Sequence, residues 1–216
     1  LFLFQLEVSP PQCSTANLAN VTKLLLASTS PARKKLLTEA GIAFLTIAPG
    51  VDEDAVVAEE RPTTPEELTL LLAKAKAEAV QGKSLVLGCD SALFFEGEIL
   101  GKPHEPEVAI ARWKQMRGRS GVLFSGHWLR DVASGLAVGK TTATIVHFAN
   151  LSDAQIERYV ATGEPLKVAG AFTIDGLGGA FVERIEGDYH TVVGLSLVAL
   201  RELVTDLGHD YQSLWR

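Results

Sequence analysis

The sequence predicts an α/β fold built on a mixed β-sheet with flanking helices. Strand-like and helix-like segments alternate along the 216 residues, an order typical of helices layered on a sheet. Within residues 121–148, polar and apolar side chains alternate between turn residues, which indicates antiparallel hairpins. Strand–helix units combined with hairpins predict a sheet that contains both parallel and antiparallel pairs.

The first strand and helix have the clearest local signals. Residues 23–28 form an apolar run that is typical of a buried strand. Ser30 is suited to cap a helix over residues 31–40, with proline at its first position and Gly41 just past its end. The other expected elements are a strand at 42–48, a helix from Thr64 to near Gly82, two or three strands within 85–103, a helix from Pro106 to about Met116, hairpins over 121–148, a helix from Ser152 to about Thr162, a glycine-rich hairpin region, and a helix from about Ser196 to Leu207.

Composition and charge limit the classes of function. Apolar residues make up 47% of the chain and charged residues 21%, which is typical of a globular protein with a sizeable core. The net charge of −6 argues against a nucleic-acid polymer as partner, because such binding needs a basic face. No apolar run approaches the roughly 20 residues of a membrane span, so we expect no membrane partner. Cys13 and Cys89 make neither a disulfide framework nor a zinc motif, which favours a reducing, cytoplasmic setting.

The beginning of the chain differs from the remainder. Residues 1–20 start with apolar residues but lack a basic n-region, so they do not predict a signal peptide. We expect an N-terminal extension over 1–20, which is flexible or adds an edge strand at residues 1–8. Residues 21–216 then form a single domain.

Hydroxyl groups and cations meet where the first strand leads into the first helix. A helix N-terminus offers free N–H groups to an anion, and Ser28 and Ser30 add hydroxyl donors. Arg33 can make a forked contact to a phosphate. Taken alone, the segment favours the alternative, an ordinary capped helix with a solvated basic face.

Residues 88–103 contain a second candidate for chemistry. Asp90 ends an apolar strand in this interpretation, and Lys102 lies in a tight turn after the next strand. An ionised carboxylate can bind Mg²⁺ or orient a water molecule, and a lysine can neutralise a phosphate oxygen. The alternative is a turn aspartate that caps backbone N–H groups, next to a surface lysine. Residues 52–54 form an acidic triplet that is usually a solvated loop and occasionally part of a metal site.

Five ordered segments together resemble the Maf family, the septum-formation-inhibitor-like proteins that are similar to nucleoside triphosphate pyrophosphatases. The resemblance covers about residues 22–206, and the sequence is most similar to a divergent branch of the family such as the one seen in actinobacteria. The five segments are LLLASTSPARKKLL, LAKAKAEAV, GCDSALFFEGEILGKP, EPLKVAGAFTIDGLGGAFV and GDYHTVVGLSL.

This resemblance implies a curved mixed sheet and two lobes around a nucleotide cleft, similar to inosine triphosphate pyrophosphatase. It implies hydrolysis of a nucleoside triphosphate to the monophosphate and pyrophosphate, with Mg²⁺ or Mn²⁺, in a homodimer. Asp90, Lys76 and Lys102 match the family's catalytic positions, and Asp90 with Glu53 would hold the metal ion. The substrate-binding positions would be Ser28, Ser30, Arg33, Glu53, Ser91 and Asp175.

Several positions depart from the usual family pattern. Ala32 replaces a cation, Ser91 replaces threonine, and Asp175 replaces glutamine. In the pyrimidine-selective branch these positions are linked to base choice, so the resemblance implies the phosphate chemistry and leaves the base unassigned. The alternative function is a catalytically weak nucleotide-binding regulator of cell division and septum formation.

Overall fold

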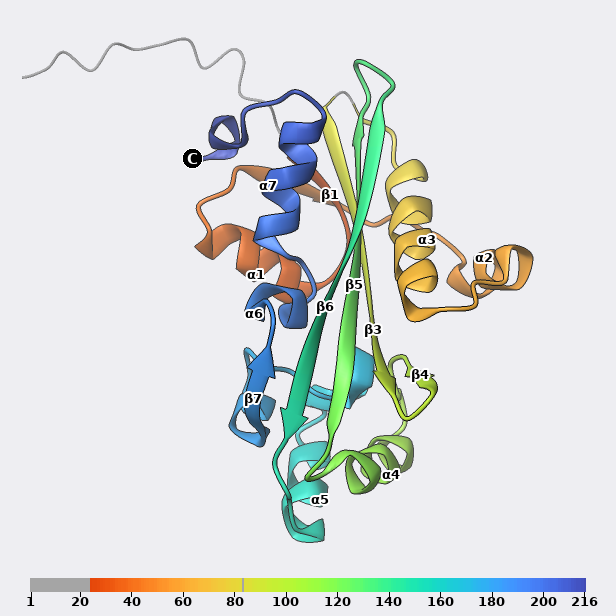
Figure 1. Ribbon diagram of the computed structural model, residues 1–216, viewed down its shortest axis with the longest axis vertical. Coiled ribbons are helices and arrows are strands. Elements are labelled where there is room, and N and C mark those ends of the chain that lie inside the picture. The colour runs from red at the N-terminus through yellow and green to blue at the C-terminus, as the bar shows by residue number, and fades with distance from the viewer. Residues whose placement is uncertain (1–23, 83) are drawn as a thin grey trace, which may run out of the picture.

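The computed structural model describes residues 24–82 and 84–216 (Figure 1). The expected extension at residues 1–20 and the expected start of the domain at residue 21 lie outside the described residues. The strands are β1 (Leu24–Ala27), β2 (Phe44–Ile47), β3 (Leu85–Phe95), β4 (Glu98–Leu100), β5 (Ser120–Asp131), β6 (Ala137–Phe148) and β7 (Val182–Glu186).

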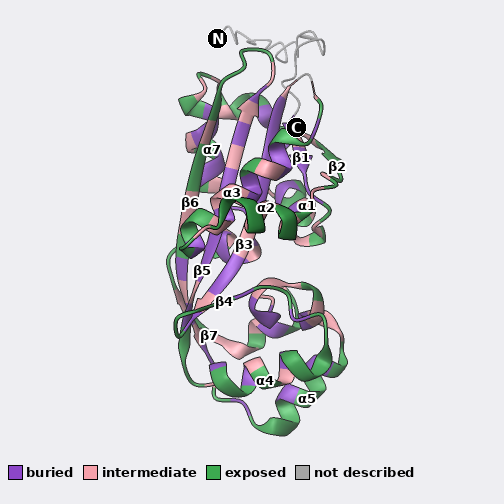
Figure 2. Cartoon of the chain, turned by 90° about the vertical axis from the view of Figure 1, so that its right-hand side faces the viewer, coloured by how far each residue is buried: buried purple, intermediate pink, exposed green. Residues whose placement is uncertain are grey.

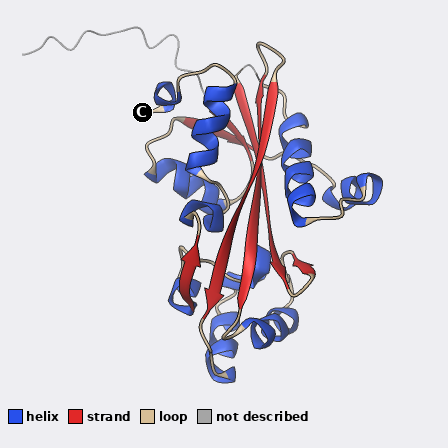
Figure 3. Ribbon diagram, in the orientation of Figure 1, coloured by secondary structure: helices blue, strands red, loops and turns tan. Residues whose placement is uncertain are grey.

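Helices cover both faces of this sheet. Figures 1 and 3 show α2 and α3 on one side of the long strands and α1, α6 and α7 on the other. The α-helices are α1 (Pro31–Glu39), α2 (Glu53–Glu60), α3 (Pro65–Glu78), α4 (Pro106–Met116), α5 (Asp153–Ala161), α6 (Tyr189–Val193) and α7 (Leu197–Asp206). The 3₁₀ helices are η2 (Glu164–Lys167), η3 (Ala169–Ala171), η4 (Leu177–Phe181) and η5 (Tyr211–Leu214).

The sheet has seven strands and confirms the predicted mixture of pairings. Its order is β2-β1-β3-β5-β6-β7, and β4 pairs with β3 at the side. The pairs of β1 with β2 and β3 are parallel, whereas β3, β5, β6 and β7 pair antiparallel. β5 and β6 have 12 residues each, so this hairpin is about 40 Å long at roughly 3.3 Å per residue. It therefore extends through both lobes (Figure 1).

Each lobe has its own hydrophobic core. One core lies between α1, α7 and the first half of β3, with Leu37, Leu87 and Leu200 almost fully buried. The other surrounds Trp113 of α4, whose ring meets Phe148 edge-on at 5.6 Å between centroids. Buried positions follow the long strands from one lobe into the other (Figure 2). A third, smaller cluster of Ala27, Ala77, Val80 and Val86 lies between α3 and the sheet. The two lobes therefore have separate cores that share one set of strands.

Two glycines let α3 lie unusually close to the sheet. A Cβ atom at Gly88 of β3 would lie 2.0 Å from the backbone oxygen of Ala73. A Cβ atom at Gly126 of β5 would lie 2.2 Å from the backbone oxygen of Thr69. Only residues without a side chain permit this approach.

Three local expectations were wrong. Asp90 lies inside β3 and does not end it, because pairing with β5 continues from Leu85 to Phe94, past the last β1 partner at Gly88. The acidic triplet is not a loop: Asp52 caps α2, and its side chain accepts a hydrogen bond from the backbone N–H of Ala55. The glycine-rich region is not a hairpin, because residues 164–181 contain the short helices η2, η3 and η4, joined by loops, and lead into the single strand β7.

The predicted helix starts at Ser30, Thr64, Pro106, Ser152 and Ser196 are all confirmed. Within the two described ranges, no helix combines the length and apolar character needed to cross a membrane.

Candidate active site

A cavity of about 950 Å³ is lined by every residue that the sequence predicts as part of the site. This volume lies in the range of roughly 300–1,000 Å³ that is usual for small-molecule sites. Residues 28–33 line one side, and residues 164–176 of the other lobe line the opposite side. The predicted site residues along its wall are Ser28, Ser30, Arg33, Glu53, Lys76, Asp90, Ser91, Lys102 and Asp175.

The register of two parallel strands brings the first two candidate segments together. Ala27, the last residue of β1, pairs with Gly88 of β3. The chain therefore leaves β1 at Ser28 next to the stretch of β3 that contains Asp90. Ser30 then caps α1 by accepting a hydrogen bond from the backbone N–H of Arg33 at 3.4 Å. The N-terminus of α1 thus opens onto the same cavity as Asp90.

The guanidinium of Arg33 is buried and bonds mainly to protein atoms. Its Nε donates to the carbonyl oxygen of Gly194 at 2.7 Å, and Nη1 donates to that of Cys89 at 2.9 Å. Further bonds run from Nη1 to Ser28 Oγ at 3.4 Å and from Nη2 to Ser91 Oγ at 3.0 Å. These bonds use four of the five N–H donors of an arginine. Arg33 therefore joins α1, β3 and the end of α6, and supplies positive charge to the cavity.

The donor and the acceptor in the hydrogen bond between Ser91 and Ser125 can be deduced. Ser125 has one hydroxyl hydrogen, and it donates this hydrogen to the carbonyl oxygen of Thr191 at 2.9 Å. Ser91 must therefore donate in its 2.8 Å contact with Ser125. Ser91 also accepts a hydrogen bond from Arg33. Because its one hydroxyl hydrogen is already used, Ser91 can only accept a further hydrogen bond from a ligand.

Lys76 connects the two candidate acidic residues. Its Nζ lies 2.6 Å from Asp90 Oδ1 and 2.9 Å from Glu53 Oε1. The side chain of Lys76 is 9% exposed and that of Asp90 14%, whereas that of Glu53 is 42% exposed. The ion pair with Asp90 is thus withdrawn from solvent, and Glu53 approaches it from the open side.

Burial raises the pKa of Asp90 above its ordinary value. The positive charges of Lys76 and Arg33 oppose this shift, and the negative charge of Glu53 adds to it. A carboxylate with a raised pKa is a better proton acceptor than an ordinary aspartate, and such groups are common at reaction sites.

The carboxylates of Asp90 and Glu53 suit a hard divalent cation. Both already converge on one positive charge, the ammonium of Lys76. Mg²⁺ is usually held by one or two carboxylates, with water and substrate phosphates as the other ligands. No set of three or more ligating side chains occurs in the described part of the chain. These two carboxylates therefore suit a metal ion that phosphate oxygens help to hold.

The opposite wall adds cations from two neighbouring loops. Lys102 follows β4, and Lys167 ends η2. The loops are joined by a hydrogen bond of 3.0 Å from the backbone N–H of His104 to the carbonyl oxygen of Leu166. Among the described residues neither lysine has a carboxylate within 4.0 Å, so both charges face the cavity unpaired.

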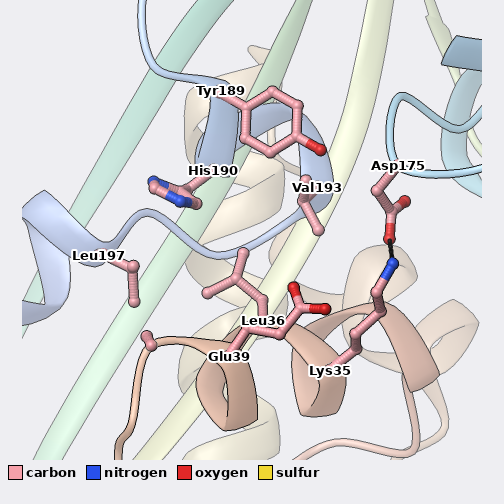
Figure 4. Close-up of a pocket in the computed structure, with 9 residues that line it drawn as sticks. Lys35, Leu36, Glu39, Asp175, Tyr189, His190, Val193 and Leu197 are labelled. Carbon is pink, nitrogen blue, oxygen red and sulfur yellow. Dashed lines mark ion pairs between the residues drawn. The ribbon is translucent and has the colours of Figure 1, made fainter.

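Asp175 lies where this cavity meets a smaller one of about 260 Å³. Its carboxylate is 3.7 Å from Nζ of Lys35, which projects from α1 (Figure 4). Tyr189, Val193 and both charged residues line the smaller cavity. Asp175 therefore stands apart from the Lys76–Asp90 pair, at the edge of the cavity.

Four polar residues that line or support this cavity were not among the predicted site residues: Lys35, Ser125, Glu164 and Lys167. Lys35 belongs to the basic cluster that follows Pro31, so its place next to Arg33 and Lys34 is a signal that could have included it. The contact of Ser125 with Ser91 depends on the register of β3 and β5, for which the sequence has no local signal.

Comparison with known proteins gives a consistent family match. The profile of the family described as "Maf-like protein" matches residues 23–207. The nucleoside triphosphate pyrophosphatase of Leifsonia xyli subsp. xyli is 51% identical over 207 residues, which cover 89% of this chain and 96% of the relative. That of Salinispora tropica is 55% identical over 201 residues, which cover 89% of this chain and 87% of the relative.

A structural neighbour is more distant. The crystal structure of a nucleoside-triphosphatase / dITP/XTP pyrophosphatase from Mycobacterium abscessus superposes with a TM-score of 0.41 at 16% identity. The superposition covers 86% of this chain and 97% of that chain. This likeness is too low to support a statement about activity.

Proposed function

Because the chain belongs to the Maf family, we propose that it is a nucleoside triphosphate pyrophosphatase. The relatives with that name are about half identical to it over nearly their whole length. The observation that carries the proposal is the buried Lys76–Asp90 pair, which shares one cavity with the N-terminus of α1. A base thus lies beside a natural seat for phosphate.

In the proposed reaction, water attacks a nucleoside triphosphate at its α-phosphorus. A bond forms between the water oxygen and this phosphorus, and the bond from the phosphorus to the oxygen that bridges to the β-phosphate breaks. The products are the nucleoside monophosphate and pyrophosphate. Lys76 holds Asp90 Oδ1, so Asp90 Oδ2 is the atom that takes the proton of the attacking water.

The cations around the cavity stabilise the negative charge that develops during this reaction. Arg33 and Lys76 act from one lobe, and Lys102 acts from the other. Ser28 and Ser30 contribute hydroxyls at the start of α1, where the helix dipole also favours an anion. Preorganised charges of this kind usually supply much of an enzyme's rate enhancement.

A divalent cation, Mg²⁺ or Mn²⁺, belongs to this proposal. Asp90 and Glu53 would hold it together with phosphate oxygens, and it would neutralise phosphate charge. Glu53 would then both bind the metal ion and pair with Lys76, whose Nζ lies 2.9 Å from Glu53 Oε1.

The test is pyrophosphate release from a panel of nucleoside triphosphates with Mg²⁺, for the wild type and for Asp90→Asn. We expect the substitution to preserve the fold and to lower kcat by about 10²–10⁴, the usual contribution of a general base. Asp206→Asn, on the exposed surface of α7, is the matched control and should leave kcat unchanged. Near-normal turnover of Asp90→Asn would remove Asp90 from the role of base.

The same assay separates the enzyme from its alternative, a nucleotide-binding regulator of cell division. A wild type that binds nucleotides without releasing pyrophosphate would favour the regulator. The intact Lys76–Asp90–Glu53 cluster favours the enzyme, because a binding protein has no need of a buried base. We further propose that the protein is cytoplasmic and forms a homodimer. In each chain, residues 21–216 would form one Maf-like domain. The panel of nucleoside triphosphates would also show which nucleobase the protein prefers.

A further inference from the structure

The loop over residues 173–178 forms the part of the cavity wall that faces α1. It contains Asp175, which pairs with Lys35 at the edge of the cavity and stands apart from the Lys76–Asp90 pair. The phosphate-binding groups instead lie around Ser28, Lys76 and Asp90. A carboxylate accepts hydrogen bonds from N–H and O–H donors, which a nucleoside has and a triphosphate lacks. The loop is therefore placed to contact the nucleoside half of a substrate.

One carboxylate holds this loop from behind. Glu164 Oε1 accepts hydrogen bonds from Thr173 Oγ1 at 2.5 Å and from the backbone N–H of Gly178 at 2.9 Å. Oε2 accepts from the backbone N–H of Leu177 at 2.9 Å. Tyr159 of α5 donates its hydroxyl hydrogen to Oε1, also at 2.9 Å. Both ends of the loop are thus tied to a single side chain.

The charge state of Glu164 matches this task. Burial alone would raise the pKa of its carboxyl group, but the hydrogen bonds from Thr173, Leu177 and Gly178 outweigh burial and hold the pKa below its usual value. Glu164 is therefore ionised near neutral pH and acts as an acceptor in every one of these bonds.

Two glycines lie directly against the side chains of Glu164 and Tyr159. A Cβ atom at Gly176 would lie 2.6 Å from Glu164 Oε2. A Cβ atom at Gly178 would lie 2.3 Å from the hydroxyl oxygen of Tyr159. The two glycines let the backbone close around the carboxylate. Asp175, next to Gly176, points toward Lys35, and both residues line the cavity (Figure 4).

We propose that Glu164 is a positioning residue for nucleoside recognition, because it fixes the loop over residues 173–178 that presents Asp175 to the cavity. The proposal rests on the proposed function, since it assumes a nucleoside triphosphate in this cavity. It assigns Glu164 no contact with the reacting atoms. Loss of the carboxylate should therefore weaken binding of the nucleoside half and leave the phosphate half unaffected.

The experiment compares Glu164→Gln with the wild type and with the control Glu157→Gln, an exposed position on α5. A glutamine keeps the size of the side chain, but only its amide oxygen accepts hydrogen bonds, whereas both carboxylate oxygens of Glu164 accept them. We expect KM for the preferred nucleoside triphosphate to rise about tenfold, from the loss of one charge-assisted hydrogen bond. kcat and the inhibition constant of inorganic triphosphate should stay within about twofold of their wild-type values. Steady-state kinetics can distinguish a tenfold change in KM from a change of this size.

A second variant and a second measurement keep the proposal testable if Glu164→Gln folds poorly. Thr173→Val removes a single donor and should raise KM in the same direction by a smaller factor. Hydrogen exchange in the wild type should show protected amides at Leu177 and Gly178, and either variant should accelerate exchange there.

Two results would overturn the proposal. One is an unchanged KM together with unchanged amide exchange in Glu164→Gln. The other is an equal rise in KM and in the inhibition constant of inorganic triphosphate, which would mean that the whole cavity has changed. If the wild type hydrolyses no nucleoside triphosphate, the proposed function fails, and the exchange data still decide whether Glu164 holds the loop.

Discussion

The close approach of α3 to the sheet can be tested with Gly88→Ala. The added Cβ would lie 2.0 Å from the backbone oxygen of Ala73, and ordinary contact begins at 3.4 Å. The helix would therefore have to move outward by about 1.4 Å. A rigid shift of this size would lengthen the 2.6 Å contact between Lys76 Nζ and Asp90 Oδ1 to at most about 4.0 Å, which is beyond hydrogen-bond range.

The expected effects are on stability and on turnover. Overpacking of a core costs about 1–3 kcal/mol of unfolding free energy, and for a chain of this size that lowers Tm by roughly 2–12 °C. The weakened contact between Lys76 and Asp90 should lower kcat/KM by up to about tenfold, the effect of one charge-assisted hydrogen bond. Denaturant unfolding and steady-state kinetics on one preparation measure both quantities.

The control is Gly101→Ala, because a Cβ atom at Gly101 would meet nothing within 4 Å. It should show neither effect. If Gly88→Ala unfolds and turns over like the wild type, the reasoning that close helix–sheet packing positions Lys76 is refuted.

Other perturbations address the charges of the cavity. Arg33→Lys should lower the unfolding free energy by about 1.5–3 kcal/mol, since two buried backbone carbonyls lose a charged donor; an unchanged denaturation midpoint would contradict this. Asp90 works as a base when deprotonated, so with its pKa raised by burial, kcat/KM should fall as pH drops through a value above the ordinary 3.9 or so. Glu53→Gln removes a negative charge that adds to this shift, so the acidic limb of the pH profile should move to lower pH; a limb that stays or moves upward argues against the coupling. Chelation with EDTA should abolish pyrophosphate release without changing the circular dichroism spectrum, and Mg²⁺ should restore it; full turnover in EDTA would show that no essential ion is bound.

The starts of the helices were predictable because their signals are local. Ser152 and Gln155 form the expected capping box, in which each side chain satisfies the backbone N–H of the other residue. Ser30 and Thr64 also accept the expected hydrogen bonds from the backbone N–H three residues later. Such contacts need no knowledge of the remainder of the chain.

The end of β3 could not be predicted from local signals. The polar pair Asp90 and Ser91 interrupts an apolar run, which is typical of a turn. The strand continues because β5 pairs with it across both lobes, with Asp90 opposite Gly126. The partner strand begins some thirty residues later in the chain, so no short window contains this information.

The sequence by itself determined the α/β class, most of the helices and the residue types able to handle a triphosphate, because periodicity, caps and side-chain chemistry are properties of neighbouring residues. Only the tertiary structure decided which of these residues meet. Lys76 meets Asp90 where α3 lies against the glycines of the sheet, and Asp175 lies in a loop that hydrogen bonds to the carboxylate of Glu164. Such contacts join segments that are distant along the chain, and strand register and close packing alone bring those segments together.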